Sequence, residues 1–241
     1  MDSVEFLSTA ATKRSHGPRS AFRIGPRCRK DVFFSETTML DFDYAKTIGK
    51  MCEVINEGRT IAESMSALLD FCESEAPNDS KLWKELRRRN YADSAWTFQQ
   101  AFGALLQSMP VHAKYTGLYF GLDALNMEES KGIEFGCSKT FDEANDDGGV
   151  KWVYNSEFYP FEIPSELHRE LYNGVVEMAG LADHAVCIAY TGLAIRDALT
   201  ELPRNLTLGG AKSRAVCFGP HDGDLYRLGT LRADGLHVHC R

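Results

Sequence analysis

The stretch Thr116–Leu125, TGLYFGLDAL, decides the fold class, because the hydrophobic pattern of the chain changes period there. Its apolar side chains alternate as they do along a strand with one buried face, at Leu118, Phe120 and Leu122. The segments 131–137 and 150–160 alternate in the same way, and Asp147-Gly148 between them is typical of a hairpin turn. We therefore expect three antiparallel strands in the middle of the chain.

Upstream of this stretch, the spacing predicts helices over residues 41–109. Apolar residues recur at intervals of three and four, with breaks near Gly58 and Pro77 and an end before Pro110. Residues 78–80, Asn-Asp-Ser, are typical of a helix start. The predicted stripe of the last helix runs through Leu82, Leu86, Ala95, Phe98, Phe102, Leu105 and Met109. Short connections favour antiparallel packing of these helices.

Downstream, Ser165 after Pro164 is typical of a helix start, and a second apolar stripe ends at Pro203. Within that stripe, residues 185–195 fit a buried strand equally well. Residues 214–239 read as a meander with turns at 221–223 and 234–235. The sequence thus predicts an α+β fold: an N-terminal antiparallel helical segment, then a mainly antiparallel sheet of five to six strands with two further helices packed on it. We expect the two groups of strands to join into one sheet.

Charge divides the chain into two parts. Residues 1–38 hold seven basic and four acidic side chains, a net charge of +3, which leaves −10 for residues 39–241 given the −7 of the whole chain. The first part has no periodicity and is expected to be a disordered basic leader, or alternatively a basic arm for an anionic partner. Residues 39–241 are expected to form a single domain. So acidic a domain repels nucleic acid and attracts a basic partner protein.

Cysteine usage and hydropathy indicate a compartment. The seven cysteines are scattered, odd in number and without a C-x-x-C pair, as expected of free, mostly buried thiols in a reducing environment. The chain lacks an apolar run of the roughly 20 residues that span a bilayer. We expect a cytoplasmic protein without a membrane partner; the pattern does not indicate an oligomeric state.

One group of residues has the composition of a metal site. His237 and His239 are two apart on a predicted strand, so both imidazoles are expected on one face, and the neighbouring turn holds His221, Asp222 and Asp224. Two histidines and a carboxylate are a common catalytic set for a divalent transition metal. The alternative is an exposed edge strand next to a hairpin tip. The sequence indicates no other cofactor.

Three further patterns have an ordinary structural alternative. Trp152, Tyr154 and Tyr159 are candidates for a ligand pocket, although aromatic strand residues more often belong to the core. In the basic stretch 81–91, the consecutive arginines 87–89 point in successive directions around a helix. This favours a solvated face with ion pairs over nucleic-acid binding. His168 is expected to take a surface or capping role.

The motifs of common enzymes are missing from the sequence, among them the phosphate-binding P-loop, the dinucleotide fingerprint, the nucleophile elbow and the H-E-x-x-H zinc helix. The sequence therefore favours a binding or regulatory module whose acidic body contacts a basic partner protein, as an inhibitor or an immunity protein does. The alternative is a metal-dependent hydrolase in which the C-terminal His/Asp cluster activates a water molecule. A small-ligand pocket on the sheet is a third hypothesis.

Overall fold

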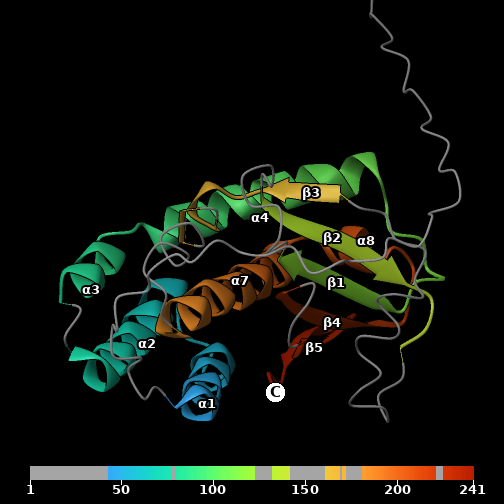
Figure 1. Ribbon diagram of the computed structural model, residues 1–241. Helices are drawn as coiled ribbons and strands as arrows, with labels where there is room; N and C mark the ends of the chain where they lie inside the picture. The colour runs from blue at the N-terminus through green and yellow to red at the C-terminus, as the bar shows by residue number, and fades with distance from the viewer. Residues whose placement is uncertain are drawn as a thin grey trace, which may run out of the picture. The chain divides into compact units, whose positions relative to one another are not determined.

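The computed structural model describes residues 43–77, 80–122, 132–141, 161–168, 170–171, 181–220 and 225–241. The expectations for residues 1–38 and for the strand over 150–160 therefore lie outside the described residues. The described elements include six helices and six strands (Figure 1). The predicted α+β class is confirmed.

With one exception, the short helix that follows Pro203, the described helices occupy the regions that the hydrophobic spacing indicates. They are α1 (Tyr44–Asn56), α2 (Ile61–Glu75), α3 (Ser80–Arg87), α4 (Tyr91–Ser108), α7 (Leu181–Glu201) and α8 (Arg204–Leu208). The single helix expected from Leu82 to Met109 is in fact two, because Asn90 caps α4 by accepting a hydrogen bond from the backbone N–H of Asp93. Met109, expected inside, is 40% exposed beyond the end of α4.

All six strands form one sheet. They are β1 (Gly117–Leu122), β2 (Gly132–Ser138), β3 (Phe161–Pro164), β4 (Ser213–Pro220), β5 (Tyr226–Arg232) and β6 (Gly235–Val238), in the order β3-β2-β1-β4-β5-β6. Every neighbouring pair is antiparallel except β1 and β4, which are parallel. The two groups of strands therefore join into one sheet, as expected, and the parallel pair of β1 and β4 is where they join.

The ambiguous segment 185–195 is helical and belongs to α7. Every residue from Ala185 to Arg196 is buried, so the helix has no solvent-facing side there. It packs against α1, α2 and α4 and also against β4, β5 and β6, and Figure 1 shows it between the other helices and the sheet. A helix that is apolar all round gives no periodic signal, which is why its sequence resembles a buried strand.

Aromatic rings join the helices to the sheet at a second place. Phe102 of α4 lies 5.4 Å from Phe120 of β1 and 5.1 Å from Phe135 of β2 between ring centroids, and both pairs are edge-to-face. The two strand rings are 5.2 Å apart. Such pairs add about 0.5–1.5 kcal/mol each to the burial of their surface.

A buried arginine fixes the start of the parallel pair. The Arg214 side chain, at the beginning of β4, is completely buried and donates hydrogen bonds to the carbonyl oxygens of Leu208, Tyr115 and Val111 at 2.5, 2.7 and 2.9 Å. These carbonyls belong to the connection before β1 and to the end of α8. One guanidinium group therefore satisfies three backbone acceptors from two segments that meet in the interior.

Two glycines in helices provide a matched test of the packing around α7. A Cβ atom at Gly192 would lie 2.7 Å from the Phe218 ring and 2.8 Å from Ile55 Cδ1, whereas one at Gly49 in α1 would meet nothing within 4 Å. We expect Gly192→Ala to destabilise the fold by about 1–3 kcal/mol and Gly49→Ala to stabilise it by about 0.5–1 kcal/mol. Denaturant unfolding measures both, and equal effects would contradict this packing.

Loss of the Arg214 side chain leaves buried carbonyl oxygens without donors. We expect Arg214→Met to lower the free energy of unfolding by about 3–5 kcal/mol, since each unsatisfied acceptor costs about 1–3 kcal/mol. Arg232→Met, at the exposed end of β5, is the control and is expected to change stability by less than about 0.5 kcal/mol. A similar, small effect of both substitutions in chemical denaturation would show that Arg214 is not needed for the junction.

Candidate functional site

Of the predicted metal set, only the two C-terminal histidines fall within the described residues. His237 lies on β6 and its Nε2 is 2.9 Å from Oδ1 of Asp234. His239 follows the last residue of β6, and its Nδ1 lies 3.1 Å from the backbone oxygen of His237. His221, Asp222 and Asp224 lie outside the described part of the chain, so the complete set stays a prediction.

Among the described residues, no group of three or more histidine, cysteine or carboxylate side chains is placed to hold a metal ion. The pocket candidates Trp152, Tyr154 and Tyr159 also fall outside the described residues, and that hypothesis stays untested.

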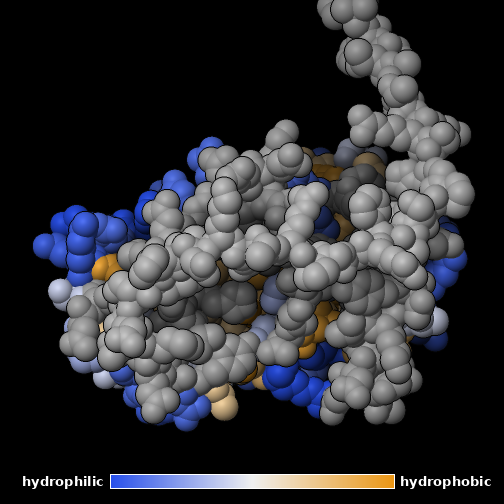
Figure 2. Space-filling view, viewed as in Figure 1, coloured by the Kyte–Doolittle hydropathy of each residue, from blue (hydrophilic) through white to orange (hydrophobic). Residues whose placement is uncertain are grey.

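The basic stretch 81–91 forms α3 and the start of α4, and Figure 2 shows hydrophilic side chains over α3. Arg87 pairs with Asp70 and Glu73, and Arg89 pairs with Glu170. The two aromatic residues of the stretch point inward: the Trp83 indole N–H donates to Ala76 O and the Tyr91 hydroxyl donates to Leu86 O. The stretch is therefore a solvated face with ion pairs, as the spacing of its arginines indicates.

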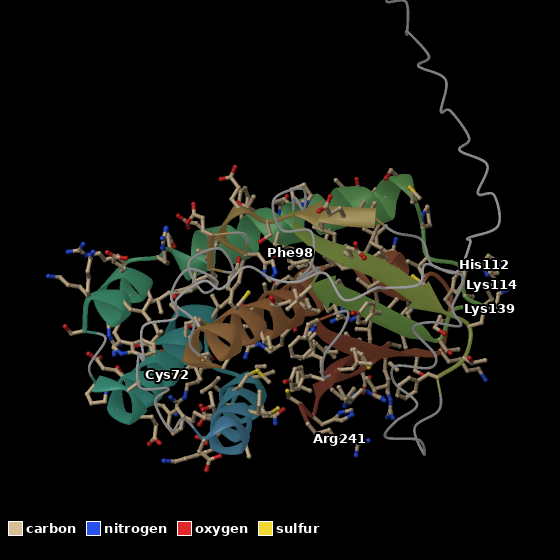
Figure 3. All side chains as sticks on the ribbon, in the orientation of Figure 1. Cys72, Phe98, His112, Lys114, Lys139 and Arg241 are labelled. Carbon is tan, nitrogen blue, oxygen red and sulfur yellow. The ribbon has the colours of Figure 1, made fainter. Side chains whose placement is uncertain are left out.

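Three further basic side chains gather at one end of the sheet, where β1 begins and β2 ends. Figure 3 labels His112, Lys114 and Lys139 at this end of the sheet, and the backbone N–H of Lys114 donates to His112 Nδ1. The Lys114 ammonium lies 4.9 Å from the centroid of the Tyr115 ring, a cation–π contact within the same loop. The acidic character of residues 39–241 is therefore not uniform over their surface.

One hollow among the described residues lies where the α1–α2 turn, α4, α7 and the end of β6 meet. It measures about 520 Å³ and we call it the Trp96 groove. Its lining consists of Gly58, Arg59, Thr60, Ile61, Ala92, Ala95, Trp96, Gln99, Arg196, Asp197, Thr200, Glu201 and Val238. Trp96 is 62% exposed and is one of two exposed large apolar side chains in the described chain; the other is Met109.

Arg196 forms the rigid base of the groove. Its guanidinium donates to the backbone oxygens of Ile55 and Arg59 at 3.2 and 2.6 Å and to Oδ1 of Asp197 at 2.8 Å. The side chain is 7% exposed. These contacts fix the α1–α2 turn against α7, and Thr60 with Glu63 forms a capping box that starts α2 at the same place.

The charges of the groove leave one carboxylate unbalanced. Arg59 pairs with Glu57 at 3.2 Å and Arg196 pairs with Asp197, so both cations of the lining are neutralised by neighbours. Glu201, at the end of α7, is exposed and has no ion-pair partner among the described residues. The groove thus combines a bare indole ring with a free carboxylate, an arrangement suited to an ammonium or guanidinium group.

Sequence reasoning missed Trp96, although the sequence contains a signal for it. Trp96 directly follows Ala95, a member of the buried stripe of α4, and one residue turns a helix by about 100°. A tryptophan that lies off the apolar stripe of its helix is directed to the surface, where its exposure needs a reason.

A buried polar cluster contradicts the expectation for His168. Its side chain is 1% exposed instead of lying at the surface, and its Nδ1 is 3.1 Å from Thr191 Oγ1 and 3.7 Å from Cys187 Sγ of α7. Burial lowers the pKa of His168 to about 4 and raises the pKa of Cys187 to about 12. Both groups are therefore neutral at pH 7, so the pair lacks the thiolate of a nucleophilic cysteine.

None of the described helices combines the length and the apolar character that crossing a bilayer requires. Comparison of the chain with models of known protein families, with curated proteins and with solved structures finds no significant match in any of the three.

The buried imidazole makes stability depend on pH. His168 has a pKa of about 4 in the folded protein and 6.5 when exposed, so its contribution is complete above pH 6.5 and is lost as the pH falls toward 4. Between pH 6.5 and 4, we expect the free energy of unfolding of the native protein to fall as the pH is lowered. The fall is expected to be steeper than that of the His168→Asn protein by up to about 1.4 kcal/mol per pH unit. Urea unfolding at several pH values measures the difference, and parallel curves would contradict it.

Proposed function

We propose that the chain is a cytoplasmic binding or regulatory module whose Trp96 groove receives a lysine or arginine side chain from a basic segment of a partner protein. One observation carries the proposal: a 62% exposed tryptophan on the wall of a groove whose unbalanced charge is the carboxylate of Glu201. A cation over an indole ring gains about 0.5–2 kcal/mol, more when the pair is shielded from water.

Net charge supports the same kind of partner. Residues 39–241 carry a net charge of −10, which attracts a basic protein at long range and speeds its association. The cysteines, which are scattered, odd in number and without a C-x-x-C pair, support the cytoplasmic placement. By occupying a basic surface of its partner, such a module acts as an inhibitor or a neutraliser.

The rigid base of the groove supports binding without rearrangement. Arg196 holds the turn after α1 against α7 through three hydrogen-bond acceptors, so this part of the lining is already in place. A site that needs no ordering loses less entropy when the partner arrives.

Trp96→Ala removes the ring and is expected to weaken binding of an arginine- and lysine-rich peptide about tenfold. Glu201→Gln is expected to weaken it less and to reduce its salt dependence, because one carboxylate is removed. Met109→Ala is the matched control: Met109 is the other exposed apolar side chain and does not line the groove.

Fluorescence anisotropy of a labelled peptide at low and moderate salt measures these affinities, with a glutamate-rich peptide of equal length as the reference. Equal affinity for the two peptides, or a Trp96→Ala protein that binds as the native chain does, would overturn the proposal.

A further inference from the structure

Two thiols from distant parts of the sequence touch each other. Cys52 lies on α1 and Cys240 follows β6, 188 positions later, and their Sγ atoms are 2.9 Å apart. Both are free cysteines. The two sulfur atoms need to approach by less than about 1 Å to reach the length of an S–S bond, about 2.05 Å.

The surrounding backbone holds this pair in place. Asn56, one turn after Cys52 on the same face of α1, accepts from the backbone N–H of Cys240 at 2.7 Å and donates to its carbonyl oxygen at 3.2 Å. The next residue, Arg241, exchanges two backbone hydrogen bonds with Arg227 of β5. Figure 1 marks the C-terminus beside α1. The Cys240 thiol is thus positioned against α1 from both sides, without relying on side-chain flexibility.

The two thiols differ in exposure and acidity. Cys52 is half-buried, whereas Cys240 is 7% exposed. The hydrogen bond from Cys240 lowers the pKa of Cys52, while the same contact and burial raise the pKa of Cys240. Elsewhere in the described chain, burial raises the pKa of Cys137, Cys187 and Cys217 to about 12. Cys52 is therefore the described cysteine best suited to act as a nucleophile.

We propose that Cys52 and Cys240 form an oxidative modification site that reacts with a hydroperoxide and closes to a disulfide between α1 and the C-terminal segment. Cys52 is the attacking thiol and Cys240 the resolving thiol. The proposal rests on the contact between the two sulfur atoms and on the Asn56 clamp, and it does not depend on the proposed function.

The reaction balances with hydrogen peroxide as the oxidant. The Cys52 thiolate attacks one peroxide oxygen: an S–O bond forms, the O–O bond breaks, and hydroxide leaves and takes up the proton that Cys52 lost. Cys240 Sγ then attacks the Cys52 sulfur: the S–S bond forms, the S–O bond breaks, and the hydroxyl leaves as water with the Cys240 proton. Two thiols thus lose two electrons and two protons, and the peroxide becomes two water molecules.

The first test uses the native full chain. After treatment with hydrogen peroxide, we expect the intact mass to fall by about 2 Da and peptide mapping without reductant to show one crosslink, Cys52 to Cys240, which dithiothreitol reverses. Since the crosslink closes a loop of 188 positions, the Tm is expected to rise by about 5–10 °C. Oxidation at other cysteines, or stable overoxidation of Cys52 without a crosslink, would overturn the proposal.

Variants separate the roles of the two thiols. Cys240→Ala is expected to leave Cys52 as a sulfenic acid that dimedone traps, and Cys52→Ala is expected to slow peroxide consumption at least tenfold. Cys217→Ala, which removes a buried cysteine of β4, is the control and is expected to form the crosslink as the native protein does. Peroxide consumption by Cys52→Ala at the rate of the control would show that Cys52 is not the nucleophile. The peptide map of the oxidised native chain tests the crosslink even if a variant fails to fold.

Discussion

The burial of α7 on all sides is the constraint from which the rest of the structure follows. A helix without a solvent-facing side needs partners all around it, and here three helices cover part of its surface and three strands cover another part. Gly192 allows the closest approach, because Phe218 of β4 and Ile55 of α1 both occupy the space that a Cβ would take. Helices and sheet therefore share one core, and the end of α7 brings Arg196 and Glu201 to the place where Trp96 lies.

Local spacing was sufficient for most elements and for the class, because each pattern reports a single helix or strand with one buried face. Local spacing was insufficient for an element that is buried on all sides. Residues 185–195 carry apolar side chains all round, so neither period stands out, and only the tertiary partners distinguish helix from strand. The parallel pairing of β1 with β4 was also not visible in the sequence, since it joins segments far apart and involves residues such as Arg214 that look like surface residues.

The same argument applies to the sites. Trp96 was recognisable in principle as an apolar residue off its stripe, whereas the groove beside it consists of residues from four elements whose meeting no local pattern reports. His168 was misjudged because its hydrogen-bond partner, Thr191, lies 23 positions away. The contact between Cys52 and Cys240 spans 188 positions and has no spacing motif. The C-terminal histidines were selected from their spacing, and because their proposed partners lie outside the described residues, the metal set stays a prediction.

The parallel junction of the sheet has a consequence for biosynthesis. Residues Gly117–Leu122 leave the ribosome about 90 residues before Ser213–Pro220, the strand that pairs with them in parallel. At about 5–20 residues per second, this interval lasts on the order of 5–20 s. During that time the inner edge of β1 lacks the strand it pairs with in the folded protein and is open to pairing with strands of other nascent chains. The centre of the sheet is thus the region of this protein that is open to pairing with other chains while translation continues.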